Sequence, residues 1–360
     1  MRIALLTPTY WPEVRRGSER VIHDLGVTLA GRGHDVTLLT RHAGRPVTRD
    51  EDGVRVERAT RLPELPGLKP YEYHVLNVPA VFARLRRDRF DLVHSFFPSE
   101  SWAAVQARRR GGPPVVASTH GIPTREYLVA RRYRLDMHLE IARYADGVSV
   151  LSEAAARAYR RYLLRDPAIL PGGVIPEAFA TDLKRGEPPT IFCAASLGDP
   201  RKRAGLLFGA FAKLREQQPD ARLQIAATLD PFMSGLVPEL PDGAEWIDVA
   251  APGALARAYA AARVSVNPAV GEAFGLVLIE SLAAGTPVVA DTSGAAPEIV
   301  SQAVGRLFTP DDEDDLASAL LEGLALGAGD ATAAVCRERA AAFSWDEIVE
   351  RYEEVYARVI

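Results

Sequence analysis

The sequence predicts an α/β fold of two Rossmann-like domains, each a doubly wound parallel sheet. The chain has 360 residues, which is more than one core of ordinary size contains. Short apolar runs alternate with longer amphipathic runs, as in parallel sheets covered by helices. Repeated prolines and glycines break residues 167–188 between two such periodic regions. We therefore expect a first domain over 1–170, a linker over 171–188 and a second domain over 189–344.

Apolar, often β-branched runs mark the strands of the first region, and longer amphipathic runs mark its helices. In order, we expect strand 3–7, helix 18–30, strands 35–40 and 54–56, helix 73–87, strand 91–95, helix 99–110, strand 114–119, helix 125–145, strand 147–151 and helix 153–164.

The second region repeats this alternation, although no tandem repeat of short period is present. We expect strand 190–195, helix 204–217, strands 222–227 and 245–247, helix 255–262, strand 264–267, helix 274–284, strand 287–290, a short strand at Leu307, helices 314–326 and 333–343, and a closing amphipathic helix 345–360.

The composition is that of a globular protein, with 48% hydrophobic and 25% charged residues. No run of 18 or more apolar residues occurs, so we expect no membrane span. The first apolar run is interrupted by Pro8, which favours a buried strand over a signal peptide. Cys193 and Cys336 lack metal or redox spacing, and this indicates a reducing cytoplasm.

The charge is distributed unevenly. Residues 1–180 carry 28 Lys and Arg against 20 Asp and Glu, whereas residues 181–360 carry 15 against 27. The basic first region suggests an anionic acceptor, an anionic lipid surface or nucleic acid as a neighbour. Nucleic acid has the least support, because no recognised binding motif accompanies the charge. A G+C-rich genome would also enrich arginine, and this explanation stays open.

The most informative segment surrounds Glu280, which is the only ionisable residue between Ala273 and Ala290. A helix that is apolar on all sides is buried, and a buried carboxylate needs polar partners. Glu272 precedes this helix beside Gly275, and a glycine loop at a helix start presents N–H groups suited to phosphate. The two carboxylates could hold hydroxyls of a sugar and a ribose on either side of that phosphate. The alternative is a core helix with one solvent-facing Glu.

The spacing Glu272-x7-Glu280 and the residues around it resemble glycosyltransferase family 4, over nearly the full chain. The resemblance implies a retaining enzyme of the GT-B fold, with two domains facing a central cleft and helix 345–360 returning to the first domain. It implies that Glu272 contacts the donor sugar, that Glu280 contacts the ribose, and that Phe274, Gly275 and Leu276 lie in the same donor site.

Two positions of the first region also match this family. His120 ends a predicted strand, and the resemblance places it near the hydroxymethyl group of the donor sugar and the reacting centre. Gly17 precedes a helix, where the absence of Cβ lets substrate or phosphate approach. The family usually has Gly-Gly here, but this chain has Arg16-Gly17, and an ordinary helix-start glycine stays an equal alternative. His94 is expected to be a satisfied core histidine.

Cations follow the first strand of the second region. Lys202 matches the family's lysine, and cations here would stabilise the developing charge of a diphosphate leaving group. The family's companion arginine position is Ser196, so Arg201 or Arg203 must substitute, and we favour Arg201. The alternative is a solvated basic helix start, which the helix dipole disfavours.

Three further patterns have weaker implications. Residues 293–300 resemble the segment whose backbone amides line the family's donor site. The acidic run Asp311–Asp315 begins a helix, so we interpret it as capping rather than as a metal site. Gly31 and Gly33 end a helix instead of following a strand, and we discard them as a dinucleotide fingerprint.

The function we expect is a metal-independent, retaining glycosyltransferase of the hexosyltransferase type. It would move a sugar from a nucleoside diphosphate donor, UDP or GDP, to a hydroxyl acceptor such as a small molecule, a glycan or a glycolipid. The alternatives are a sugar-nucleotide epimerase and a catalytically silent sugar-nucleotide-binding partner. We expect no metal, no nucleic acid and a cytoplasmic location. Residues 81–89 and 125–134 allow contact with the inner membrane face, although their apolar residues could instead cover the sheet.

Overall fold

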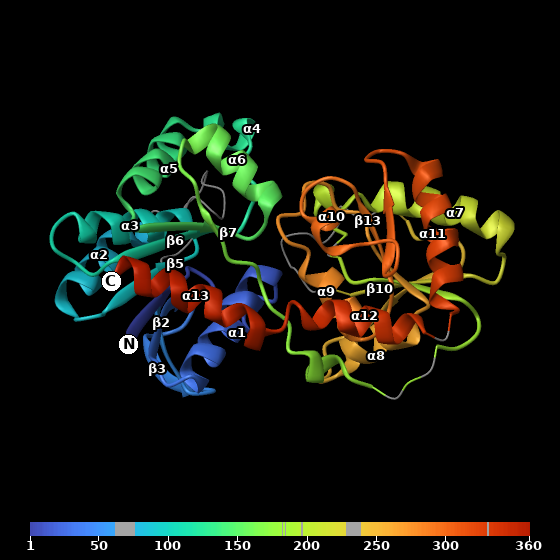
Figure 1. The fold of residues 1–360 in the computed structure, drawn as a ribbon, viewed down its shortest axis with the longest axis horizontal. Helices are drawn as coiled ribbons and strands as arrows, with labels where there is room; N and C mark the ends of the chain where they lie inside the picture. Colours follow the sequence, from blue (N-terminus) through green and yellow to red (C-terminus); the bar gives the residue numbers. More distant parts are fainter. Residues whose placement is uncertain (62–75, 182, 184, 196, 228–238, 330) are drawn as a thin grey trace. The chain divides into compact units, whose positions relative to one another are not determined.

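The computed structural model describes residues 1–61, 76–181, 183, 185–195, 197–227, 239–329 and 331–360. They form two compact units, Met1–Gly173 with Ile348–Ile360, and Val174–Glu347. Each unit is a largely or wholly parallel sheet between helices (Figure 1), which confirms the predicted α/β fold with two Rossmann-like sheets.

The first unit contains a sheet in the order β3-β4-β2-β1-β5-β6-β7-β8. Its strands are β1 (Arg2–Leu6), β2 (Asp35–His42), β3 (Val47–Glu51), β4 (Val54–Thr60), β5 (Leu92–Ser95), β6 (Val115–Thr119), β7 (Gly147–Val150) and β8 (Ala168–Ile169). Strands β3 and β4 pair antiparallel, and the other paired strands of this sheet are parallel. Leu5 of β1 pairs in register with Leu38 of β2 and His94 of β5. Because parallel strands end at one edge, this sheet gathers the loops after β1, β2, β5 and β6.

Helices cover both faces of this sheet (Figure 1). They are α1 (Gly17–Gly31), α2 (Val78–Arg87), α3 (Pro98–Arg108), α4 (Arg125–Val129), α5 (Arg132–Tyr144), α6 (Glu153–Leu163) and the part of α13 (Trp345–Val359) that begins at Ile348. The core side chains Leu6 and Val93 pack with Leu85 of α2 and Tyr159 of α6. The predicted single helix 125–145 is wrong, because the chain leaves the helical path between α4 and α5. Residues 73–75 of predicted helix 73–87 lie outside the described residues.

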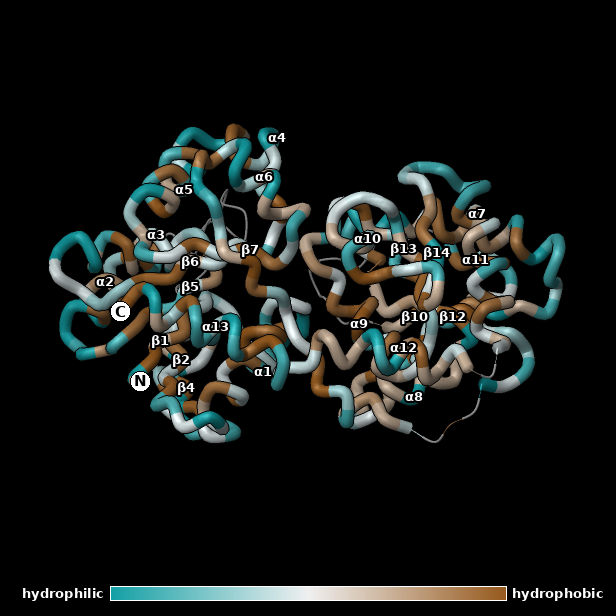
Figure 2. The backbone as a smooth tube through the Cα atoms, viewed as in Figure 1, coloured by the Kyte–Doolittle hydropathy of each residue, from teal (hydrophilic) through white to brown (hydrophobic). Residues whose placement is uncertain are grey.

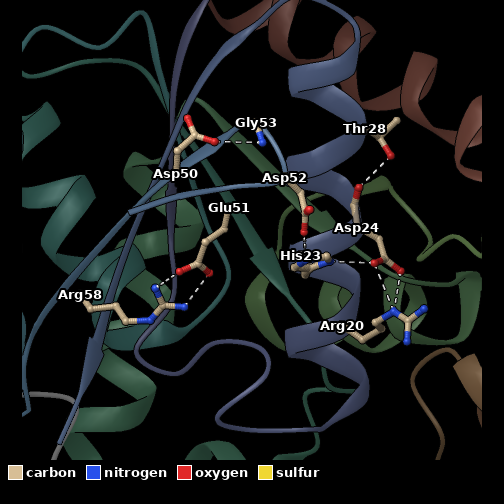
Figure 3. A network of polar contacts seen from close by, with 9 residues as sticks. All are labelled: Arg20, His23, Asp24, Thr28, Asp50, Glu51, Asp52, Gly53 and Arg58. Carbon is tan, nitrogen blue, oxygen red and sulfur yellow. Dashed lines mark hydrogen bonds and ion pairs between the residues drawn. The ribbon is translucent and has the colours of Figure 1, made fainter. Parts of the chain in front are cut away.

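A hairpin that the sequence analysis missed joins β3 to β4. Asp52 and Gly53 at its turn have φ of 52° and 79°, the left-handed conformations that a tight two-residue hairpin requires. Figure 3 shows the polar network that ties this hairpin to α1: His23 lies 3.0 Å from Asp24 and 3.5 Å from Asp52. Arg58 of β4 donates to both carboxylate oxygens of Glu51, at 2.8 Å for the second. The His23 contact with Asp52 thus joins the turn of the hairpin to α1, the helix that follows the loop after β1.

His94 of β5 is fully buried and contacts the last helix, α13. Its Nδ1 lies 2.7 Å from the Tyr356 hydroxyl and its Nε2 lies 2.6 Å from the Ser118 hydroxyl. Burial and the neighbouring His120 lower the pKa of His94. The prediction of a satisfied core histidine is confirmed. Tyr352 of the same helix donates to the carbonyl oxygen of Leu170 at 3.2 Å, so α13 is anchored within the first unit from Ile348 on.

The second unit contains a parallel sheet in the order β11-β10-β9-β12-β13-β14. Its strands are β9 (Thr190–Cys193), β10 (Arg222–Ala226), β11 (Ala244–Ile247), β12 (Val264–Asn267), β13 (Val288–Asp291) and β14 (Gly305–Phe308). Its helices are η2 (Pro176–Phe179), η3 (Pro200–Lys202), α7 (Ala204–Gln217), α8 (Ala254–Ala261), α9 (Leu276–Ala283), α10 (Ala296–Ile299), α11 (Glu313–Gly327) and α12 (Thr332–Ala341). The unit begins at Val174, so the predicted linker contains both the boundary and η2.

Helix α9 is buried along almost its whole length, as its apolar sequence predicts. Leu278, Ile279, Ser281 and Leu282 are each at most 1% exposed, and Figure 2 shows the helix in the hydrophobic colour. The Ser281 hydroxyl donates to the carbonyl oxygen of Thr286 at 3.0 Å, which satisfies one polar group of this helix.

No individual helix in the described ranges has both the length and the apolar composition of a membrane span, although α11 and α12 would pass together by length and composition alone. The apolar residues Val81, Phe82 and Leu85 of α2 pack on the core of the first unit. The sheet-covering interpretation is therefore confirmed for this segment.

Candidate functional site

Two loops of the second unit meet at the carboxyl edge of its sheet. One follows β9 and contains Lys202, and the other follows β12 and contains Glu272; these strands are neighbours. The backbone N–H of Val270 donates to the carbonyl oxygen of Arg201 at 3.0 Å. The Lys202 ammonium donates to Glu272 Oε2 at 2.7 Å, with both side chains mostly buried. A cation and a carboxylate 70 residues apart in sequence are thus paired at the opening of α9.

The environment of Glu272 favours its charged form. Burial alone would raise its pKa, but Lys202, with smaller contributions from Arg201 and a hydrogen bond with Asn267, lowers the pKa below its usual value. The Glu272 carbonyl oxygen accepts from the N–H of Ala295 at 2.8 Å, so its backbone is fixed as well. Asn267 ends a buried strand, and this position could have indicated its role from sequence; the sequence analysis missed it.

Gly294 allows the segment after β13 to approach Glu272. It has φ of +72°, and a Cβ atom there would lie 2.3 Å from the Glu272 carbonyl oxygen. Ser293 Oγ accepts from the N–H of Gly271 at 2.8 Å. The segment that resembles the family's amide-lined donor wall therefore does lie against Glu272.

The predicted trio Phe274, Gly275 and Leu276 forms the start of α9. Gly275 has φ of +92° and is the N-cap, and no side chain caps the helix there. Phe274 is 5% exposed and its ring makes an edge contact with Phe343, at 6.1 Å between centroids. Leu276 is the first helical residue. A helix start without a side-chain cap offers backbone N–H groups and a positive dipole end to an anion.

Glu280 is 6% exposed inside α9. The Tyr259 hydroxyl donates to its Oε2 at 3.3 Å, and burial together with the charge of Glu280 raises the pKa of Tyr259 far above its ordinary value. Tyr259 and Asn267, the partners of the two carboxylates, line one narrow crevice with Val277. The interpretation of Glu280 as a solvent-facing surface residue is wrong. Tyr259 lies in an amphipathic helix, where the sequence gives no signal for this role.

The two arginines beside Lys202 differ in their partners. Arg201 is exposed and contacts Asp199 at 2.6 Å. Arg203 is mostly buried and lies 3.5 Å from Asp291, which is 1% exposed, and 3.0 Å from Asp311. Arg203 is therefore engaged in the fold, while Arg201 is the more accessible cation. Ser196 lies outside the described residues.

The acidic run caps α11, as predicted. Asp312 is the N-cap and its side chain accepts from the N–H of Asp315 at 2.9 Å. Glu313 and Asp314 pair with Lys213. Within the part of the chain that the structure describes, no cluster of three or more His, Cys, Asp or Glu could hold a metal ion.

Gly17 and His120 lie in the first unit. Gly17 is the first residue of α1, and the extended Arg16 before it makes no side-chain cap bond. His120 follows β6 and its ring makes an edge contact with Phe96, at 5.2 Å between centroids. Both ring nitrogens are buried without a hydrogen-bond partner among the described residues, and burial lowers the pKa of His120 to about 4. A neutral imidazole with two unused nitrogens is an unsatisfied group at the edge where substrates bind.

Comparison with known proteins gives the family. The sequence pattern of Glycosyltransferase Family 4 matches residues 15–178, and that of Glycosyl transferases group 1 matches residues 188–325. The D-inositol 3-phosphate glycosyltransferase of Nocardiopsis dassonvillei is 30% identical, over 77% of this chain and 74% of the relative. The phosphatidyl-myo-inositol mannosyltransferase of Mycobacterium tuberculosis (strain H37Rv) is 27% identical, over 90% and 86%.

Among solved structures, the chain is similar to sucrose-phosphate synthase from Thermosynechococcus elongatus. The TM-score is 0.85 at 26% identity, over 99% of this chain and 98% of that one. The chain therefore belongs to glycosyltransferase family 4, and it is a glycosyltransferase of the GT-B fold.

Proposed function

We propose that the protein transfers a sugar, with retention of anomeric configuration, from a nucleoside diphosphate sugar to a hydroxyl acceptor. The observation that supports this most is the Lys202–Glu272 pair at the uncapped start of α9. A donor that carries both phosphates and sugar hydroxyls offers each partner of this pair a better-matched group. Lys202 would turn to the diphosphate and Glu272 to the hydroxyls.

Each donor part then has a chemically suited neighbour. Lys202 and Arg201 are the cations, and the N–H groups and dipole of α9 add to their field, so the charge that develops on the leaving diphosphate is stabilised. Glu280, with Tyr259 beside it, is the carboxylate for the ribose hydroxyls. UDP and GDP are the nucleotides we expect. Since these groups already supply positive charge, we propose that the reaction proceeds without a bound metal.

The acceptor belongs to the first unit in this proposal. His120 is neutral at physiological pH and can donate one hydrogen bond and accept another, which suits a sugar hydroxymethyl group. A front-face attack, in which the leaving phosphate oxygen takes the acceptor proton as the glycosidic bond breaks, leaves His120 as a positioning group. Gly17 at the start of α1 would let substrate approach the backbone.

A thermal-shift screen against nucleotides and nucleotide sugars tests the donor, because a ligand that binds the native state raises Tm by mass action. UDP or GDP and their sugars should stabilise the protein, and no shift with any of them would contradict the proposal.

NMR of the product then tests retention, since an inverted anomer would exclude it. Turnover in excess EDTA tests metal independence. Nucleoside diphosphate release that needs acceptor separates transfer from epimerisation, and donor binding with no turnover of any acceptor would indicate a silent binding partner.

We also propose that the protein works in the cytoplasm in contact with the inner membrane face. The exposed side chains that support this are on α4 and α5: Tyr127, Val129 and Tyr133 are 41%, 55% and 44% exposed. Arg125 and Arg132 are exposed beside them. Aromatic and apolar groups among arginines suit an anionic interface. Flotation with anionic vesicles at low salt should carry the protein upward, and sedimentation without lipid would exclude this contact.

A further inference from the structure

Two arginines lie side by side at the carboxyl edge of the first unit, apart from the residues that the sequence singled out. Arg41 is near the end of β2, and Arg61 directly follows β4. The Arg41 guanidinium donates to the carbonyl oxygens of Thr60 and Asn77 at 3.3 and 3.4 Å. The Arg61 guanidinium donates to the carbonyl oxygen of Arg41 at 3.4 Å. These contacts to neutral backbone oxygens hold both guanidinium groups in place.

Several buried polar atoms at this edge of the sheet lack partners among the described residues. Thr40 is 5% exposed and Asn77 is 3% exposed. Thr40 Oγ1, Asn77 Oδ1 and Arg61 Nε are buried with no hydrogen-bond partner among the residues that the structure describes. Leaving a buried polar atom unpaired costs about 1–3 kcal/mol, and such atoms concentrate where a ligand completes them.

Among the described residues, positive charge predominates around the two guanidinium groups. Neither Arg41 nor Arg61 forms an ion pair with a carboxylate in the described parts of the chain. The acidic group that acts on Arg41 is Glu100, which is 3% exposed and accepts from the Ser99 hydroxyl at 2.5 Å. Burial raises the pKa of Glu100 to about 7, so it offsets at most part of the two positive charges near neutral pH.

From this geometry we infer that Arg41, Arg61 and Asn77 form a subsite for the phosphate monoester group of a phosphorylated sugar or polyol acceptor. Two guanidinium groups, each with several N–H donors, match the several oxygens of a phosphate. Asn77 Oδ1, which needs a donor, matches a hydroxyl group beside that phosphate. Thr40 and Arg41 are on β2, which neighbours β1, and β5 and then β6 follow in the sheet. The subsite therefore shares the edge where His120 lies.

This inference rests on the proposed function only in treating the phosphorylated molecule as the acceptor. Phosphate binding to the subsite can be tested independently of that function. The competing interpretation is a purely structural role, in which Arg41 only joins the end of β4 to the start of α2. In that case, replacing Arg41 would change the stability of the protein and leave its phosphate affinity unchanged.

The experiment is calorimetric titration of the full-length protein with inorganic phosphate, glucose 6-phosphate and glucose. We expect phosphate and glucose 6-phosphate to bind and glucose to bind more weakly. Arg41→Gln and Arg61→Gln should each weaken phosphate binding by about tenfold or more, since each removes charged hydrogen bonds. The matched control is Arg89→Gln, an exposed arginine that precedes β5 at the opposite edge, and it should change nothing.

Unchanged phosphate affinity in both arginine variants, or no phosphate binding to the native protein, would overturn the inference. Phosphate that binds in the second unit instead would respond to Lys202→Gln and not to Arg41→Gln. If Arg41→Gln fails to fold, Arg41→Lys and Arg61→Lys test the same subsite with smaller changes, and each should weaken binding at least about threefold while Tm is kept.

Two comparisons separate the remaining sources of failure. Binding to vesicles that contain phosphatidylinositol, but not to glucose 6-phosphate, would assign the phosphate to a lipid headgroup instead of a soluble acceptor. Nucleotide-induced Tm shifts that are the same in native protein and Arg41→Gln would keep the donor proposal intact even if the phosphate subsite fails. Absent shifts in both would remove the donor proposal without affecting the phosphate result.

Discussion

The Lys202 ammonium lies 2.7 Å from the Glu272 carboxylate, and both belong to loops at the carboxyl edge of one parallel sheet. In the unliganded protein each side chain is the other's counter-ion. A donor that binds here must replace this contact with contacts of its own. The exchange would give Lys202 an anionic partner and Glu272 hydroxyl donors, so neither charged group would be left without a partner in a mostly buried position.

Replacing Glu272 with Gln should reduce kcat/KM about 10- to 100-fold, because a charged hydrogen bond to the donor sugar is lost. Lys202 loses its partner as well, so the affinity for nucleoside diphosphate alone should stay the same or rise. Steady-state kinetics and nucleotide titration check both. Glu245→Gln is the control, since Glu245 is an exposed acidic residue of the same unit. Equal kinetics for the native enzyme and Glu272→Gln would rule out the assigned role.

Glu280→Gln should weaken donor binding about tenfold or more with a smaller effect on kcat, because a ribose contact is the same in the ground and transition states. Tyr259→Phe removes the hydroxyl that donates to Glu280 at 3.3 Å and should give a milder loss. The split between KM and kcat is the measurement. A large fall in kcat with KM unchanged would place Glu280 at the reacting centre instead.

Arg201 and Arg203 should behave differently. Arg203→Gln leaves the buried Asp291 without its cation and should lower the free energy of unfolding by about 3 kcal/mol. Arg201→Gln should leave Tm unchanged and weaken nucleoside diphosphate binding several-fold, because its exposed guanidinium is available to phosphate. Melting curves and nucleotide titrations of both variants give the comparison. The opposite pattern would make Arg203 the diphosphate ligand.

Gly294→Ala should lower both Tm and donor affinity, since its φ is +72° and a Cβ atom would meet the Glu272 carbonyl oxygen at 2.3 Å. The cost should exceed about 1 kcal/mol. Gly205→Ala is the matched control: no neighbouring heavy atom lies within 4 Å of its Cβ position, and it lies in helix α7. We expect that control to be neutral or slightly stabilising. Native-like kinetics in Gly294→Ala would show that this close approach does not shape the site.

His120 should make stability depend on pH. Its pKa is about 4 in the folded chain and about 6.5 when unfolded, so between these values only the unfolded state takes up the proton. The contribution of neutral His120 to the free energy of unfolding is complete above pH 6.5 and is lost as the pH falls toward 4. Between pH 7 and pH 5 the loss should be about 2 kcal/mol. Denaturant unfolding of the native protein and His120→Gln at both pH values gives the difference. Parallel pH curves for the two proteins would contradict this assignment.

The sequence alone was sufficient for the alternation of strands and helices, the buried character of α9 and the family to which the chain belongs. These follow from local patterns: apolar periodicity, and short motifs whose residues are close together in the chain. The β3–β4 hairpin carried the local signal Asp52-Gly53 between β-forming residues, so it could have been predicted as well.

Only the tertiary structure decided which side chains become partners. The Lys202–Glu272 pair, the Tyr259–Glu280 hydrogen bond and the involvement of Arg203 with Asp291 join residues that are 70, 21 and 88 positions apart. Burial likewise decided that both ring nitrogens of His120 lack hydrogen-bond partners among the described residues. It also decided that Arg41 and Arg61 contact carbonyl oxygens and no carboxylate in that part of the chain. Parallel strands connect through helices, so loops distant in sequence converge at one edge, and no local pattern records which of their side chains will touch.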